Sequence, residues 1–289
     1  MQLGVLFPQQ EIGVDASAIR AYAQEVESYG YRHLTCYEHV VGVNAGSRPG
    51  WDGLYDSEDA FHEPFVLFAH LAAVTVRLEF ATCVLVLPQR QTALVAKQVA
   101  ELAVLSDDRF FMGVAAGWNQ AEFDALGVPW ARRGERLDEQ ITLLRRLLAE
   151  PTVDFRGEFD TIPDVGIAPR PARPVPIWVG GAPSALVLTR VAKLGDGWMM
   201  QGATPENIVA PLERLRPLLH AEGRELGELG IEGRLAIQSV GAEGVAAEAA
   251  AWAASGATHL SIATQGLGLR SVDEHLALLR DVRDRIDLD

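Results

Sequence analysis

Residues 78–118 read LEFATCVLVLPQRQTALVAKQVAELAVLSDDRFFMGVAAGW, and this stretch decides the fold. Its two ends, 78–87 and 109–115, are apolar along their length, which predicts strands that are covered on both faces. Between them, residues 92–105 are predicted to form a helix. A strand, a helix and a second strand in this order indicate parallel strands joined by a crossover helix.

The same alternation continues outward in both directions along the chain. Further strands are expected at 3–7, 33–37, 176–179, 196–200, 231–238 and 258–262. Further helices are expected at 16–29, 137–148, 184–194, 205–222, 245–254 and 272–286. Eight such strands in a chain of 289 residues predict an α/β fold, a (β/α)₈ TIM barrel that takes up residues 1–289 as one domain. An open, doubly wound sheet is the alternative.

Two segments interrupt this alternation. Residues 41–63 follow the second strand, are rich in Gly, Asp and Ser, and carry Trp51 and Tyr55. Residues 151–174 are rich in proline and form an insertion between the fourth helix and the fifth strand. Loops that follow strands lie at the C-terminal face of a barrel, where active sites form. We therefore expect 41–63 to shape a substrate pocket, with a passive excursion as the alternative.

The charge balance argues against two classes of partner. With 25 Lys and Arg against 39 Asp and Glu, the formal net charge is −14. So acidic a chain does not attract nucleic acid or anionic membrane surfaces. Its apolar runs fall short of the roughly 20 residues that span a bilayer, and its first residues lack the features of a signal peptide. Two cysteines form no disulfide framework, so a reducing, cytoplasmic location is expected.

The second strand ends in Cys36, Tyr37, Glu38 and His39. A histidine at the catalytic end of a barrel strand is a candidate proton donor or acceptor, because its ordinary pKa is near 6.5. A structural histidine is the equal alternative. Cys83, within the third strand, is interpreted as a small core residue rather than a nucleophile.

Small residues end two other strands. Residues 113–118, GVAAGW, allow backbone to approach a ligand, although the dinucleotide fingerprint GxGxxG is absent. Gly180, Gly181 and Ala182 precede the helix at 184–194, where free amides suit a phosphate. An ordinary turn is the alternative there, as a core tryptophan is for Trp198. The sequence has no HxH, HExxH or GxSxG motif, so we expect no metal site.

Seven strings taken together resemble the luciferase-like flavin- or deazaflavin-dependent oxidoreductases across nearly the whole chain. They are Glu38-His39, TCVLVLPQRQTALVAKQVAELAVLS (82–106), DRFFMGVAAGW (108–118), EFDALG (122–127), RGERLDE (133–139), IWVGG (177–181) and LGDGWM (194–199). The EHVV segment and the 87–106 segment are most similar to the branch that uses coenzyme F420, a deazaflavin. The branch that uses FMN shares most of these strings.

The resemblance implies a (β/α)₈ barrel with its insertion at 151–174 and a cis peptide bond between Cys83 and Val84. It places His39 opposite the cofactor ring as an acid or base. The cofactor-binding residues that it implies are Glu38, Cys83, Val84, Ala115, Gly117, Trp118, Gly180, Gly181, Ala182 and Trp198. Because strand side chains alternate, Glu38 is expected to point away from the His39 side and to act as a structural partner.

The function implied is an F420-dependent oxidoreductase that transfers hydride between the deazaflavin and a small organic substrate. The alternatives are an FMN-dependent two-component monooxygenase of the same fold and a non-catalytic cofactor-binding barrel. Family members are commonly dimers, so a homodimer is expected. The family usually has Gly-Gly-Arg where Asp107, Asp108 and Arg109 stand. Its sugar-phosphate dehydrogenase branch carries a glutamate at the position of Trp118, so that activity is not expected here.

Overall fold

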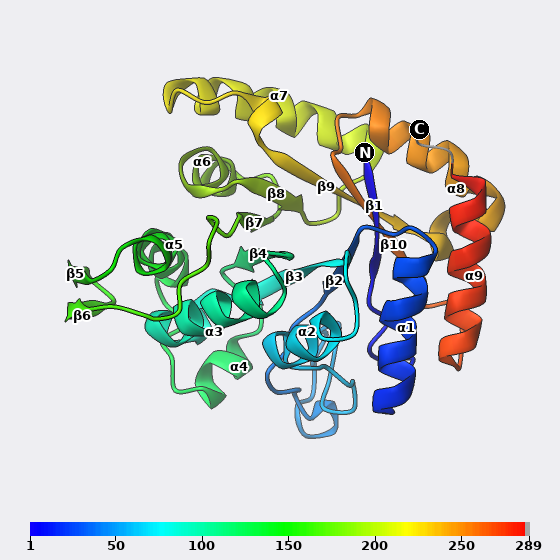
Figure 1. The fold of residues 1–289 in the computed structure, drawn as a ribbon, viewed down its shortest axis with the longest axis horizontal. Coiled ribbons are helices and arrows are strands. Elements are labelled where there is room, and N and C mark those ends of the chain that lie inside the picture. Colours follow the sequence, from blue (N-terminus) through cyan, green and yellow to red (C-terminus); the bar gives the residue numbers. More distant parts are fainter. Residues whose placement is uncertain (287–289) are drawn as a thin grey trace.

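The computed structural model describes residues 1–286 and confirms the (β/α)₈ barrel. Eight parallel strands close into a ring in the order β1-β10-β9-β8-β7-β4-β3-β2 (Figure 1). The strands are β1 (Gln2–Leu6), β2 (His33–Cys36), β3 (Glu79–Val86), β4 (Phe110–Ala115), β7 (Ile177–Gly181), β8 (Gly197–Met200), β9 (Gly230–Ala236) and β10 (His259–Ala263). Because all of them run in one direction, their carboxyl ends meet at one face of the barrel.

Helices surround the ring and cover its outer face (Figure 1). They are α1 (Ala16–Ser28), α2 (Pro64–Ala72), α3 (Thr92–Leu105), α4 (Gln120–Ala125), α5 (Arg133–Ala149), α6 (Ala185–Leu194), α7 (Pro205–Ala221), α8 (Ile237–Ala254) and α9 (Val272–Arg285). In α1, Ile19, Tyr22, Ala23 and Val26 are buried at helical spacing, and Asp15 caps the first turn by accepting from the Ser17 amide at 2.9 Å.

Two helices had not been expected from the sequence. Nearly all residues of α2 are apolar, so the helix lacks the alternation of apolar and polar positions that marks a helix in sequence. Glu63 caps it by accepting from the Val66 amide at 2.9 Å. α4 is only six residues long, too short to show a period, and Asn119 caps it by accepting from the Ala121 amide.

The largest boundary differences from expectation are at the start of α8 and at the start of α5, which begins at Arg133 rather than at residue 137. The strand expected at 231–238 ends at Ala236, and residues 237–238 begin α8, whose helix is broken at Gly241 (φ 67°, ψ 165°). This residue accounts for the early part of α8 being missed, because a left-handed residue separates it from the alanine-rich part. The 151–174 insertion contains a short antiparallel hairpin, β5 (Val153–Arg156) and β6 (Thr161–Val165), which projects from the barrel (Figure 1).

Aromatic rings fill the N-terminal end of the barrel interior. The Trp178 ring centroid lies 4.9 Å from that of Phe111 and 4.8 Å from that of His259. Trp178 fits because its neighbours on β8 and β9 are glycines: a Cβ atom would lie 2.3 Å from its ring at Gly197 and 1.9 Å at Gly230. The active site of this fold lies at the opposite, C-terminal end of the barrel.

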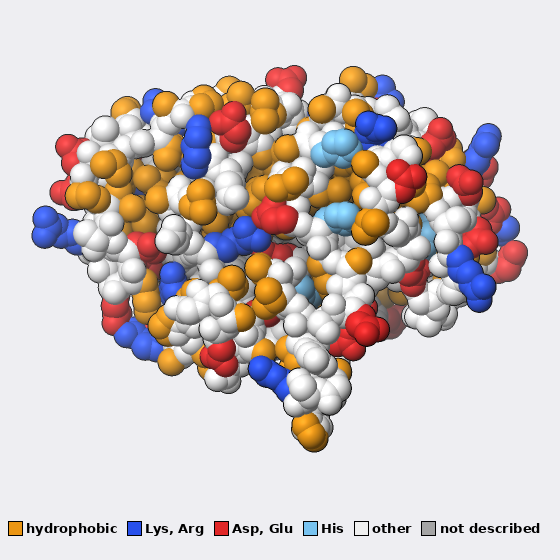
Figure 2. Space-filling model, turned by 90° about the horizontal axis from the view of Figure 1, so that it is seen from below, with side chains coloured by type: hydrophobic (Ala, Val, Ile, Leu, Met, Phe, Trp, Pro, Cys, Tyr) orange, Lys and Arg blue, Asp and Glu red, His pale blue; other side chains and the backbone are white. Residues whose placement is uncertain are grey.

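Both signs of charge are scattered over the face drawn in Figure 2, with hydrophobic side chains between them. Basic side chains form no continuous field on that face, in keeping with the net charge of −14. Among residues 1–286, no helix is long and apolar enough to span a membrane.

Candidate active site

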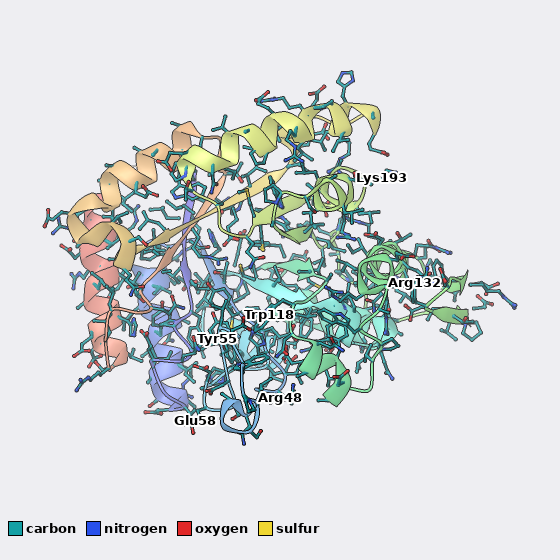
Figure 3. The ribbon with its side chains drawn as sticks, turned by 180° about the vertical axis from the view of Figure 1, so that it is seen from behind. Arg48, Tyr55, Glu58, Trp118, Arg132 and Lys193 are labelled. Atoms are coloured by element: carbon teal, nitrogen blue, oxygen red, sulfur yellow. The ribbon has the colours of Figure 1, made fainter. Side chains whose placement is uncertain are left out.

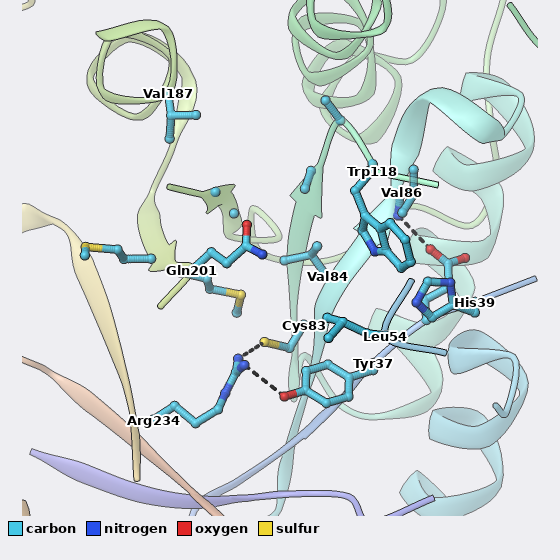
Figure 4. Close-up of a pocket in the computed structure, with 18 of the residues that line it drawn as sticks. Tyr37, His39, Leu54, Cys83, Val84, Val86, Trp118, Val187, Gln201 and Arg234 are labelled. Atoms are coloured by element: carbon cyan, nitrogen blue, oxygen red, sulfur yellow. Dashed lines mark hydrogen bonds between the residues drawn. The ribbon is translucent and has the colours of Figure 1, made fainter. Parts of the chain in front are cut away.

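A cavity of about 360 Å³ opens at the carboxyl ends of the barrel strands (Figure 4). Most of the residues singled out from the sequence lie in its wall. They are Glu38, His39, Cys83, Val84, Ala115, Gly117, Trp118, Gly180 and Gly181. The structure therefore brings together residues from four strands, β2, β3, β4 and β7, or from the segments directly after them. A pocket in this position is the ordinary active site of the fold.

Two of the expected residues do not line the cavity. Trp198 is fully buried in the core outside the barrel interior, and its indole N–H donates to the Gly181 carbonyl at 3.1 Å. Ala182 comes after the last residue of β7 and is likewise absent from the cavity wall. Alternation along β8 explains the first difference: Trp198 points outward and Met199, the next residue, points into the barrel. Trp198 thus supports the backbone of the glycine pair from behind.

His39 is held in the cavity wall by a carboxylate. Its Nδ1 lies 3.0 Å from Oε2 of Glu122, which comes from α4 and is itself buried. The other oxygen, Oε1, accepts from the Val40 amide at 2.9 Å, so the carboxylate holds the ring and the backbone together. Nε2 has no hydrogen-bond partner among residues 1–286 and is left for a ligand.

Aromatic side chains enclose His39. The ring centroids of Phe61, Tyr55 and Trp118 lie 4.7, 5.2 and 5.7 Å from that of the imidazole. Figure 3 shows Tyr55, from the 41–63 loop, beside Trp118, which follows β4. Trp51 of the same loop stacks on Trp118 at 6.1 Å. The 41–63 loop therefore supplies part of the cavity wall and reinforces the rest.

The peptide bond between Cys83 and Val84 is cis, as the resemblance implied. The register of β3 against β4 shifts at this point, between Thr82 and Leu85. The backbone bulge places both Cys83 and Val84 in the cavity wall (Figure 4).

Glu38 is a structural residue by its contacts. Its carboxylate is buried, accepts from the Val86 amide and from Nε of Arg90 at 2.6 and 2.9 Å, and forms a second bond with Nη2 of Arg90. Burial raises the pKa of Glu38, and the Arg90 guanidinium and the Val86 amide oppose this effect. The side chain thus ties the end of β2 to the end of β3, although Glu38 also forms part of the cavity wall.

The glycine pair ends β7 rather than forming the helix turn itself. Gly180 packs so closely on the bulge that a Cβ atom there would lie 2.6 Å from Cγ1 of Val84. Gly181 has φ +143°, a conformation that side-chain-bearing residues rarely adopt. Ser184 caps α6 by accepting from the Val187 amide at 3.2 Å. The strand end and the start of α6 therefore lie together at one side of the cavity, where Val187 also contributes to the wall.

Sequence reasoning missed Arg234 on β9 and gave Tyr37 no role. Both lie in the cavity wall, and Nη1 of Arg234 donates to the Tyr37 hydroxyl at 3.0 Å (Figure 4). The available signal was the pair Glu232 and Arg234, two charged residues two positions apart in an otherwise apolar strand. That spacing places both on the same face of the strand, inside the barrel.

Residues 1–276 match the family described as luciferase-like monooxygenase. An uncharacterized protein of Mycobacterium tuberculosis is 41% identical over 223 residues, which cover 75% of this chain and 77% of that protein. The FMNH2-dependent dimethylsulfone monooxygenase of Pseudomonas fluorescens is 31% identical over 209 residues, 71% of this chain and 52% of its own. The structure of an F420-dependent secondary alcohol dehydrogenase superposes with a TM-score of 0.80 at 14% identity and covers 99% of each chain.

Proposed function

The chain belongs to the luciferase-like monooxygenase family of oxidoreductases, and on this premise we propose that it transfers hydride between coenzyme F420 and a small organic substrate. The observation that carries the proposal is the position of His39. Its imidazole faces an apolar cavity with Nδ1 bound to Glu122 and Nε2 free among the described residues. A hydride that moves to or from a carbonyl or alcohol carbon needs a proton partner, and His39 is placed to be that partner.

The cavity suits a flat, largely apolar ring. Val84, Val86, Ala115, Met199 and Trp118 present apolar surface around it. Binding pockets for organic cofactors are typically apolar with a few placed polar groups. The Cys83–Val84 bulge, with Gly180 packed behind it, gives the wall on which such a ring would lie. When bound, F420 supplies a carbon centre that exchanges hydride.

The backbone at the end of β7 suits the cofactor's phosphate. Gly180 and Gly181 have no side chains to block an approach, and the N-terminal end of α6 follows three residues later. Amide groups and the helix dipole at such a position favour an anion. Only two lysines, Lys97 and Lys193, occur in the chain, and neither lines the cavity. We therefore assign phosphate binding to backbone amides of this segment.

His39 would give a proton to, or take one from, the substrate oxygen through Nε2. Glu122 holds the imidazole by Nδ1 and thereby fixes which nitrogen faces the cavity. Phe61, Tyr55 and Trp118 keep bulk water away from the ring. In this arrangement Glu122 is a positioning residue, and His39 is the residue that meets the substrate.

The alternative is an FMN-dependent monooxygenase, and two relatives that are named as monooxygenases support it. The dimethylsulfone monooxygenase is named as FMNH2-dependent, and the pyrimidine monooxygenase RutA of Escherichia coli is 30% identical over 218 residues. Against it stand the EHVV and 87–106 segments, which are most similar to the F420-using branch. The chemical difference is sharp, because a flavin can activate oxygen and a deazaflavin exchanges hydride only.

An anaerobic turnover assay tests the proposal. Reduced F420 is mixed with the protein and a panel of aldehydes, ketones and enones, and reoxidation is followed by absorbance. In parallel, reduced FMN is supplied in air and substrate oxygenation is followed by mass spectrometry. We expect substrate-dependent oxidation of F420 and no oxygenation. Oxygenation with FMN and no reaction with F420 would establish the alternative.

The homodimer and the cytoplasmic location expected from the sequence remain predictions. Sedimentation of the purified protein tests the first, and fractionation of the source cells tests the second.

A further inference from the structure

Arg234 lies inside the barrel, yet water can reach it from the cavity. It belongs to β9, where Glu232 and Arg234 point inward and Gly233 between them packs outward on Trp252. Its side chain is 34% exposed, whereas that of Glu232, one layer deeper, is 4% exposed. The exposed part of Arg234 belongs to the cavity wall (Figure 4).

The contacts of Arg234 use part of its donor capacity. Nη1 donates to the Tyr37 hydroxyl at 3.0 Å, and Nη2 donates to Sγ of Cys83 at 2.7 Å. Each of these nitrogens carries a second hydrogen. Burial raises the pKa of Tyr37 to about 12, although the charge of Arg234 opposes this effect. The Tyr37 hydroxyl is therefore protonated at neutral pH and can donate a hydrogen bond as well. Several N–H and O–H donors therefore meet at this side of the cavity.

The acidic group near Arg234 is the Glu232 carboxylate, which also accepts hydrogen bonds from other residues. Oε2 of Glu232 lies 3.7 Å from Nη2, beyond the distance of a good hydrogen bond. The same carboxylate accepts from Ser261 at 2.9 Å and from Cys83 at 3.5 Å. Burial raises the pKa of Cys83 to about 12, so its thiol is protonated and brings no charge of its own. Among residues 1–286, Arg234 thus has an acidic neighbour but no close, two-point carboxylate partner.

Arg190, the other arginine of the cavity wall, provides the contrast. Its guanidinium forms two bonds with the Asp138 carboxylate and a third with the Gly134 carbonyl at 3.0 Å. Its side chain is only 10% exposed. Of the two arginines, Arg234 is the one whose charge and donors are open to a ligand.

We propose that Arg234 and Tyr37 form a binding site for a planar oxyanion in the cavity. The inference rests on the proposed function, since the oxyanion belongs either to the pyrimidine edge of the reduced cofactor ring or to a carboxylate of the substrate. A guanidinium offers parallel N–H donors that match two acceptors on one planar group, and the Tyr37 hydroxyl adds a third direction. Either source places negative charge where fixed donors stabilise it.

Binding measurements with three variants test the site. Arg234→Gln removes the charge, and Tyr37→Phe removes one donor while Arg234 stays to balance Glu232. Gln201→Ala is the matched control, because it removes another polar side chain from the same cavity wall. Dissociation constants are measured for oxidised and reduced F420, for oxidised and reduced FMN, and for benzoate and benzyl alcohol. Thermal melting identifies any variant that does not fold, and Tyr37→Phe decides the question if Arg234→Gln is lost.

The two sources give different results. If the ring supplies the oxyanion, Arg234→Gln weakens binding of the reduced cofactor relative to the oxidised form by about tenfold or more, and Tyr37→Phe by a few fold. If the substrate supplies it, the wild-type protein binds benzoate about tenfold more tightly than benzyl alcohol, and both variants lose that preference. Gln201→Ala changes neither ratio.

Two affinity ratios decide the question: that of the reduced to the oxidised cofactor, and that of benzoate to benzyl alcohol. The site is disproved if both ratios are the same in Arg234→Gln and Tyr37→Phe as in the wild-type protein. A wild-type protein that binds neither F420 nor FMN would instead contradict the proposed function. In that case the benzoate preference, measured on the protein without cofactor, still decides whether the oxyanion site exists.

Discussion

Nδ1 of His39 lies 3.0 Å from Oε2 of Glu122, although the two residues are 83 positions apart in the chain. The contact joins the segment after β2 to the short helix α4. The same carboxylate also accepts from the Val40 amide at 2.9 Å, so two partners hold the carboxylate that orients the imidazole. The arrangement resembles the carboxylate–histidine pairs that orient an imidazole for proton transfer.

Replacing His39 should abolish most turnover and leave cofactor binding in place. His39→Asn removes the proton partner, so turnover should fall by about 10²–10⁴-fold while the dissociation constant of the cofactor changes by a few fold at most. Steady-state kinetics and a binding titration on the same preparation provide the measurement.

Glu122→Gln is the matched variant, because it keeps the shape of the contact and removes its charge. A smaller loss with a displaced pH–rate profile is expected, since Glu122 acts through His39. Near-normal turnover of His39→Asn would assign the proton transfer to water or to His62, the histidine of the 41–63 loop.

Replacing Glu38 should cost stability rather than chemistry. Glu38→Gln leaves the Arg90 guanidinium without its buried carboxylate partner, which should lower the free energy of unfolding by about 3 kcal/mol. Glu63→Gln is the control, because Glu63 binds the same arginine at 3.0 Å from a more exposed position and the glutamine oxygen can still cap α2. This substitution should cost about 1 kcal/mol or less. Urea unfolding measures both. Equal losses would mean that the buried contact has no special role.

A charge at the start of α6 should repel the cofactor's phosphate. Gly181 is a poor test position, because its φ of +143° strains any side chain. Ser184→Asp and Ser184→Asn both preserve the helix cap, and only the first adds a negative charge. Ser184→Asp should weaken binding of FMN by about tenfold and leave riboflavin, which has no phosphate, unchanged. Equal affinities of both variants for FMN would remove the phosphate from this position.

Stability should fall as the solution is acidified below pH 6.5. Burial lowers the pKa of His33 to about 3 and that of His259 to about 4, from an ordinary value of 6.5. Between the folded and the unfolded pKa values, the unfolded chain binds protons at these histidines that the folded chain does not. The contribution of the neutral histidines to the free energy of unfolding is therefore fully present above pH 6.5 and is lost as the pH falls toward 4. Each group contributes a slope of up to about 1.4 kcal/mol per pH unit.

His33→Gln should therefore flatten the dependence of unfolding free energy on pH, whereas replacement of the exposed His220 by Gln should not. Chemical unfolding at several pH values between 4.5 and 7.5 supplies the comparison. An unchanged slope in His33→Gln would show that this histidine does not control acid stability.

The sequence was sufficient to predict the barrel, because each strand is an apolar run and each long helix has a period. It was insufficient where that signal is missing. α2 is apolar on every face, α4 is six residues long, and the hairpin β5–β6 lies in a proline-rich segment.

The residues of the candidate site were likewise predictable where they lie on regular strands and were not predictable elsewhere. The ends of β2, β3, β4 and β7 were predictable, because a closed barrel brings strand ends together. Trp198 was expected to face the cavity, but it lies on the outer face of β8, and the next residue, Met199, faces the cavity instead. Arg234 was missed although its spacing from Glu232 was visible. The contact between His39 and Glu122 depends on a loop and a short helix, whose positions no periodic pattern encodes.

Parallel titration of the purified protein with F420 and FMN tests the central claim most directly. Both cofactors are added to the same preparation, and binding is followed by fluorescence or equilibrium dialysis. The proposed function predicts saturable binding of F420, with a dissociation constant about tenfold or more below that of FMN. Tighter binding of FMN than of F420, or saturable binding of neither, would contradict it.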